Sequence, residues 1–283
     1  MSAQTEAILQ KVKELAVLPQ VVHQVLELTN NPNANARDLE RVISIDQGMS
    51  ARVLNTVNSA YYGLPRKIAS IKDAVVLLGF KTIRNLAMTA SMFDLFVGKT
   101  DRQNLRRGKW WRHAIDTGLC ARLIASQVDG VSPDEAYTAG LLHDIGKPLL
   151  DRYGGAPYEQ VEEWVHQGIS ELEAEREVFG CDHTEVGREV GLHWGFPEKL
   201  VEAIGEHHAE EQGAWQDARL VAVVILANRL AHILRQSNVP DDWWFYLPGW
   251  LLETLHLTPQ QLHSLYLGCE AEIHSSPIAT LGR

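Results

Sequence analysis

The stretch from Leu141 to Lys147, Leu-Leu-His-Asp-Ile-Gly-Lys, places an imidazole and a carboxylate side by side after an apolar segment. The apolar run from Ala139 to Leu142 is typical of a helix that is packed into a core. Gly146 and Pro148 predict that this helix stops just after the His-Asp pair. An imidazole and a carboxylate together suit first-row transition-metal ions. A His-Asp pair alone is equally compatible with a structural role.

Outward from this stretch, apolar residues recur mainly at the spacing of three and four that is typical of amphipathic helices, with almost no alternation typical of strands. We therefore expect an all-α fold. Between Gly98 and Arg112 basic residues are concentrated in an otherwise acidic chain, which predicts a domain junction. The expected units are an N-terminal helical subdomain (residues 1–105) and a helical bundle (residues 106–283) with aromatic-rich C-terminal helices.

The composition of the 283 residues, 45% apolar and 22% charged, is typical of a folded globular protein. The formal charge of −10 disfavours nucleic-acid binding, because such binding depends on clustered cations. The longest apolar run, Leu220 to Ala227, is too short to span a membrane. With no secretory signal at the start and no C-x-x-C pair, we expect a cytoplasmic protein whose cysteines are buried thiols.

Several of the twelve histidines stand at or near predicted helix ends. The candidate metal ligands are His113, His143, His183, His207 and His208, together with Asp144. His183 is expected at the first position of a helix, behind an N-cap at Asp182 that Glu185 would complete as a capping box. Each histidine alone is compatible with a structural role. Together they predict a metal site, because separate helices can supply ligands to one ion. The others are expected to be structural: His23, His166, His193, His232, His256, His263 and His274.

A basic stripe precedes His113. Arg102, Arg106, Lys109 and His113 recur at spacings of four, three and four, so on a helix they share one face. That face would direct three cations toward the candidate metal, and phosphate is the anion that Arg and Lys bind best. The alternative is a solvated segment between domains whose charges only aid solubility.

The order of these motifs resembles a known superfamily. His113, then His143-Asp144, then His183, then His207-His208 resembles the HD and HD-GYP metal-dependent phosphohydrolases, and Lys147 matches the HD-GYP form His-Asp-x-x-Lys. The first half resembles the HDOD variety, the HD-related output domain. The matching motifs are Leu18-Pro19, Ile45-Asp46, Asn58-Ser59 and Leu77-Leu78-Gly79. This resemblance implies an HD-like helical bundle that acts in bacterial signal transduction, usually as an output or docking domain and often without the metal ligands. Here most of the ligands are retained.

Three departures from the HD pattern limit the expected chemistry. Asn228 stands where the resemblance places a distal aspartate, and an amide oxygen can bind a metal but brings no charge. The segment from Ala209 to Gly213 lacks the Gly-Tyr-Pro element, so cleavage of cyclic-di-GMP is not expected. Lys109 replaces the glutamate of some trinuclear members, which argues against a third ion.

Two functions remain open from the sequence. The preferred one is a signalling output domain that retains a site for a metal or a phosphate ligand and binds a signalling protein, with no membrane partner. The alternative is a phosphohydrolase acting on a phosphate ester or nucleotide. In that case one or two ions of iron, manganese or zinc, bridged by Asp144, would activate water, and Lys147 would stabilise charge on the phosphoryl oxygens. Nucleic-acid binding, favoured only by the cluster of basic residues from Lys99 to Arg112, comes third.

Overall fold

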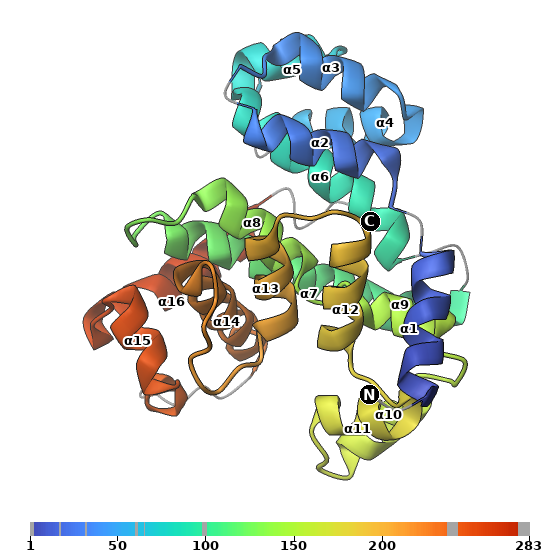
Figure 1. The fold of residues 1–283 in the computed structure, drawn as a ribbon. Coiled ribbons are helices and arrows are strands. Elements are labelled where there is room, and N and C mark those ends of the chain that lie inside the picture. The colour runs from blue at the N-terminus through green and yellow to red at the C-terminus, as the bar shows by residue number, and fades with distance from the viewer. Residues whose placement is uncertain are drawn as a thin grey trace.

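A computed structural model describes residues 3–16, 18–31, 33–59, 62–64, 66–97, 101–236 and 243–276. All regular elements in these ranges are helices, which confirms the all-α prediction (Figure 1). Among the same residues, no helix has the length and apolar character that crossing a bilayer requires. The three cysteines are buried free thiols, as expected: Cys120, Cys181 and Cys269.

The N-terminal lobe, at the top of Figure 1, is a group of five helices in which four pack around the fifth, α6. They are α2 (Gln20–Asn30), α3 (Ala36–Ser44), α4 (Gln47–Val57), α5 (Ile71–Leu78) and α6 (Phe80–Phe96). Local sequence sets where three of them begin, because side chains of Asn35, Asp46 and Ser70 accept hydrogen bonds from backbone N–H groups of the first turn.

The second lobe is built around α7, which packs against α8, α14 and α16. Its helices are α7 (Asp101–Ala125), α8 (Pro133–Leu142), α9 (Gly146–Tyr153), α10 (Glu159–His166), α11 (Glu171–Phe179), α12 (His183–His193), α13 (Glu198–Glu206), α14 (Ala218–Ile233), the 3-10 helix η2 (Trp243–Tyr246), α15 (Gly249–Leu255) and α16 (Pro259–Ser275). Glycines bring α7 and α8 close together: a Cβ atom added to Gly140 would lie 2.9 Å from the Cα atom of Gly118. This contact places the end of α8 beside the middle of α7.

The first helix, α1 (Ala3–Leu15), packs against α9 and α12 in the second lobe (Figure 1). Trp194 of the second lobe donates its indole N–H to the carbonyl of Ala16, 3.0 Å away. Lys13 forms an ion pair of 2.6 Å with Glu189. The helix α1 thus packs on the second lobe, and α7 runs through residue 105, the predicted boundary, without a break. Residues 98–100 of the predicted junction lie outside the described ranges.

Candidate metal centre

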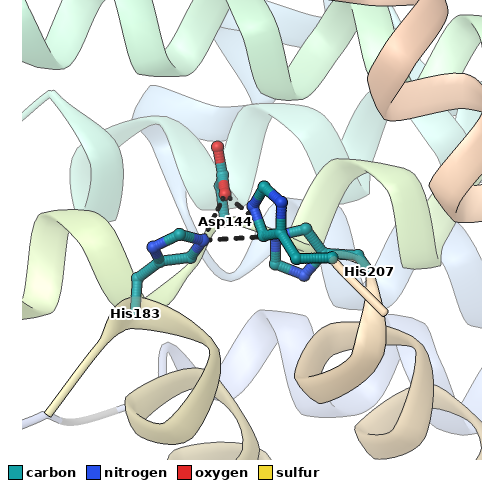
Figure 2. Close-up of side chains that lie close together, drawn as sticks. Asp144, His183 and His207 are labelled. Atoms are coloured by element: carbon teal, nitrogen blue, oxygen red, sulfur yellow. Dashed lines mark hydrogen bonds and ion pairs between the residues drawn. The ribbon is translucent and has the colours of Figure 1, made fainter. Parts of the chain in front are cut away.

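Asp144 lies buried in the turn between α8 and α9, surrounded by imidazoles from separate elements. Its Oδ1 atom lies 3.3 Å from His183 Nε2 and 3.4 Å from His207 Nε2 (Figure 2). Its Oδ2 atom lies 3.4 Å from Nε2 of His143 and 3.8 Å from Nε2 of His113. The structure thus brings these residues into one cluster, while their role as metal ligands remains a prediction.

Hydrogen bonds fix the tautomer of three of these rings. Nδ1 of His143 donates to the carbonyl of Gly140, and Nδ1 of His207 donates to the carbonyl of Ile204, each over 2.7 Å. A carbonyl oxygen can only accept, so the ring proton must be on Nδ1. Nδ1 of His183 donates to Oε2 of Glu175 over 2.6 Å. In all three rings Nε2 therefore carries a lone pair that points toward Asp144, the arrangement found where carboxylates or carbonyls orient metal-bound histidines.

The atoms at the centre are consequently all acceptors. Nε2 of His183 lies only 3.2 Å from Nε2 of His207, and both lie next to a carboxylate oxygen. Among the described residues, Oδ1 of Asp144 and Nε2 of His143 have no hydrogen-bond partner, whereas Oδ2 of Asp144 lies beside the ammonium of Lys147. Buried acceptors without donors are costly, and a shared cation removes the cost. A tetrahedral ion with bonds of about 2.1 Å holds its ligand atoms roughly 3.4 Å apart, which the observed spacing fits.

The protonation states also suit a metal. Burial lowers the pKa of His183 and of His207 below the ordinary value, and it lowers the pKa of His208 to about 2. Burial alone would raise the pKa of Asp144, but its neighbours, His143 first and then Lys147, outweigh burial and hold that pKa well below its usual range. Neutral imidazoles beside an ionised carboxylate are the forms that bind a metal.

An outer group of polar side chains surrounds the cluster. Nζ of Lys147 lies 2.9 Å from Oδ2 of Asp144 and 2.9 Å from Oε2 of Glu171. Burial opposes the charge of Lys147, but the neighbouring carboxylates raise its pKa above the ordinary value. The hydroxyl of Tyr158 donates to Oε1 of Glu175. Neither Glu171 nor Glu175 could be selected from the sequence, because carboxylates four residues apart on a helix are most often solvated.

Asn228 faces the cluster from α14, as the resemblance implied. Its Oδ1 atom accepts a hydrogen bond of 2.9 Å from Nε2 of His113. Nε2 of His113 therefore carries a proton, in contrast to Nε2 of the other three rings. Nδ1 of His113 is buried and has no hydrogen-bond partner in the described part of the chain.

A cavity of about 270 Å³ adjoins the cluster. It is lined by His207, His208, Asn228, Arg229, His232, Ile233, Trp243, Tyr246 and Leu247. The ring of His232 lies against that of His113, with centroids 4.2 Å apart. His232 therefore adjoins the site, although it was expected to be a structural histidine. Its position one helical turn after Asn228 is the signal that was available. Of the C-terminal aromatics, Trp243 is packed in the core, whereas Phe245 and Tyr246 are exposed.

The basic stripe lies on one helix, α7, and of its described side chains neither Arg106 nor Lys109 forms an ion pair with Asp144. The guanidinium of Arg106 forms ion pairs with Asp151, Glu159 and Glu162, at 3.2, 2.8 and 2.8 Å. Those carboxylates, on α9 and α10, neutralise the charge that was expected to hold phosphate. Lys109 is exposed, and the side chain of Arg102 lies outside the described part of the structure.

Comparison with known proteins identifies relatives of this arrangement. A profile for the HDOD domain matches residues 15–210. An HDOD domain protein of unknown function from Geobacter sulfurreducens superposes with a TM-score of 0.79 at 26% identity, covering 96% of this chain and 97% of that one. A candidate phosphohydrolase from Shewanella amazonensis superposes with a TM-score of 0.73 at 27% identity, covering 96% of each chain.

Curated sequences match over shorter regions. An uncharacterized protein of Treponema pallidum is 24% identical over 81% of this chain and 44% of its own length. The ribonuclease Y of Thermosipho melanesiensis is 32% identical over 39% of this chain and 16% of its own length. The chain thus spans less than half the length of these curated relatives. Because the HDOD profile covers well over half of the sequence and the fold agrees, this chain belongs to the HDOD domain family.

Proposed function

We propose that this chain is a bacterial signal-transduction output domain that holds a divalent transition-metal ion, iron, manganese or zinc, at Asp144. One observation carries the proposal: the lone pairs of His183 Nε2, His207 Nε2 and Asp144 Oδ1 converge at 3.2–3.4 Å with no hydrogen between them. A cation in the centre would remove the cost of burying these acceptors without donors.

The candidate ligands form two groups that share Asp144. One group is Asp144, His183, His207 and His208. The other is His113, His143 and Asp144, with Asn228 adjoining it. A carboxylate shared in this way is compatible with one or with two ions.

Elemental analysis of the purified protein tests the proposal. We expect bound iron, manganese or zinc in the natural protein and its loss in the variant His183→Ala. A matched control is His166→Ala, because His166 is exposed on α10 and also bonds a backbone carbonyl through Nδ1. Equal metal content in the natural protein and in His183→Ala would contradict a role for this cluster in metal binding.

The signalling role calls for a protein partner. The family resemblance supports a docking function, and the N-terminal lobe exposes apolar side chains at Ile45, Val76 and Leu77. Large apolar side chains that are exposed in one patch are typical of interaction surfaces, and Val76 and Leu77 are neighbours on α5.

A second candidate function is a metal-dependent phosphohydrolase, which is favoured by the cavity beside His207 and His208. A divalent ion bound there would polarise a phosphate ester and activate water. In this chemistry Asp144 would hold the ion and Lys147 would balance negative charge at the site. Hydrolysis of bis-p-nitrophenyl phosphate that is lost in Asp144→Asn would support it. A metal-loaded protein without turnover would leave the output domain as the function.

A further inference from the structure

The solvent-facing side of α5, at the far end of the N-terminal lobe, combines apolar and basic side chains (Figure 1). Val76 and Leu77 are 74% and 51% exposed, and the exposed Lys72 lies one helical turn before Val76. Arg66 and Lys67, in the segment that leads into α5, are exposed as well. None of these three cations forms an ion pair within the described ranges. This surface, the basic tip, comprises Arg66, Lys67, Lys72, Asp73, Val76 and Leu77, with three cations and one carboxylate.

The hairpin of α10 and α11 combines apolar side chains with acidic ones. Trp164, Val165 and Ile169 are exposed together where α10 ends, and the N–H group of Ile169 donates to the carbonyl of Trp164 over 3.2 Å. The only Arg or Lys of residues 159–179, Arg176, is already paired with Asp182. Exposed carboxylates that form no ion pair with any described residue lie on the same two helices: Glu163, Glu173 and Glu177. These three carboxylates and the three apolar side chains form a second surface, the acidic hairpin.

The basic tip and the acidic hairpin lie at opposite ends of the molecule, α5 at the top of Figure 1 and α10 and α11 at the bottom. They therefore cannot meet within one copy of the chain. Each nevertheless carries the charge that the other lacks, beside exposed apolar side chains. Complementary charge selects the partner and its orientation, whereas burial of the apolar side chains, Trp164 above all, supplies affinity. The surface that would complement either one is thus present on every other copy.

We propose that the basic tip docks on the acidic hairpin of a second copy of this chain. This inference rests on the docking role in the proposed function, which it deepens by naming the partner, and it does not depend on the metal. Because the contact joins two different surfaces, each copy can offer its tip to one neighbour and its hairpin to another. Few apolar side chains are exposed on each side, so the association is weak and reversible, and salt weakens it further.

The test is the mass of the full chain in solution. Sedimentation velocity at low salt should show a mean mass that rises with protein concentration above the mass of one chain, and high salt should reverse this rise. Val76→Asp at the tip and Trp164→Ser at the hairpin should each weaken the association roughly tenfold or more, as expected of a central interface residue. Leu267→Ser changes an exposed apolar side chain on α16 and should associate as the natural protein does. Unchanged association in either of the first two variants would refute the proposed contact.

A mixture of the two variants identifies which surfaces meet. An equimolar mixture of Val76→Asp and Trp164→Ser contains one intact tip and one intact hairpin, so it should form dimers and nothing larger. Dimers of Trp164→Ser alone would indicate a contact between two tips, and dimers of Val76→Asp alone a contact between two hairpins. Either result would overturn the inference. If Trp164→Ser does not fold, Val165→Ser takes its place, because Val165 is exposed on the same surface.

A natural protein that stays monomeric at every concentration would also overturn the inference. Such a result would leave the metal content untouched, so elemental analysis still decides the metal-binding part of the proposed function independently. Conversely, a protein that associates through these two surfaces but binds no metal would retain the inference and contradict the proposed metal centre.

Discussion

Replacing Gly146 with alanine should damage both the fold and the metal centre. The added Cβ atom would lie 1.9 Å from the backbone oxygen of His183 and 2.7 Å from its carbonyl carbon. Close carbon–oxygen contacts are roughly 3.3 Å, so the two segments must separate by about 1.4 Å. The obstructing atoms are backbone at the start of α12, and they cannot rotate away as a side chain could. Overpacking of this kind costs about 3 kcal/mol or more.

For a chain of this size, that loss corresponds to a fall in the midpoint of thermal unfolding of about 6 °C or more. Displacement of His183 by 1 Å should also remove most of the bound metal, because a ligand site tolerates errors of only about 0.5 Å. Thermal melts followed by circular dichroism, with elemental analysis of the same samples, measure both effects. The control is Gly108→Ala on α7, where a Cβ atom meets nothing within 4 Å and alanine should stabilise the helix by up to about 1 kcal/mol. If Gly146→Ala unfolds at the same temperature as the natural protein and keeps its metal, the close approach of these segments is not required for stability or for metal binding.

Three further predictions address the surroundings of the site. Asp151→Ala removes the buried partner of Arg107, 2.6 Å away, and should lower the free energy of unfolding in urea by about 3–5 kcal/mol; a loss below 1 kcal/mol would contradict the pairing. Burial raises the pKa of Tyr137 to about 12, whereas a tyrosine in an unfolded chain has a pKa of about 10. The unfolded state therefore loses this proton first as the pH rises. The free energy of unfolding should fall by up to about 3 kcal/mol between pH 10 and pH 12. The midpoint of urea unfolding should therefore fall less between pH 8 and pH 11 in Tyr137→Phe than in the natural protein. Glu175→Gln replaces the carboxyl group that holds Nδ1 of His183 and should weaken metal binding 10- to 100-fold in a competition with a chelating dye, and an unchanged Kd would exclude the orienting role.

Much of the fold follows from local patterns. The apolar run from Leu220 to Ala227 lies within one helix, α14 (Ala218–Ile233). The capping box of Asp182 and Glu185 is formed as predicted. The interpretation of Gly146 was wrong: this glycine does not end a helix but begins α9, with Pro148 in the first turn. A glycine is needed at position 146 because the His183 backbone lies so close to it, and no local sequence pattern reveals this contact.

The candidate site was harder to derive, because its members interact across long sequence separations. The candidate ligands were selected by their positions near helix ends and by family resemblance, and the structure brings them together. The partners of Arg106 could not be anticipated, since Asp151 and Glu162 follow it by 45 and 56 residues and nothing local links them to α7. Glu175 was missed for the same reason, although it orients His183.

Helix ends explain why histidines at these positions suit a metal. His143 and His207 are the C-cap residues of α8 and α13, and each donates Nδ1–H to the carbonyl three residues earlier. Those carbonyls belong to the last turn of the helix, where backbone oxygens lack intrahelical partners. The hydrogen bond from Nδ1 thus satisfies a carbonyl at the helix end and leaves Nε2 with a lone pair that points away from the helix.

The same local bond is not sufficient to make a metal site. His166 and His274 donate Nδ1–H to the carbonyls of Glu162 and Glu270, four residues earlier, yet both rings are exposed to solvent. Water satisfies Nε2 at those positions, so nothing there requires a cation. At His143 and His207, burial excludes water and α8 and α13 end at the same carboxylate. The chemistry therefore depends on which helix ends the core brings together, and the density of histidines in the sequence alone could not distinguish these two from His166.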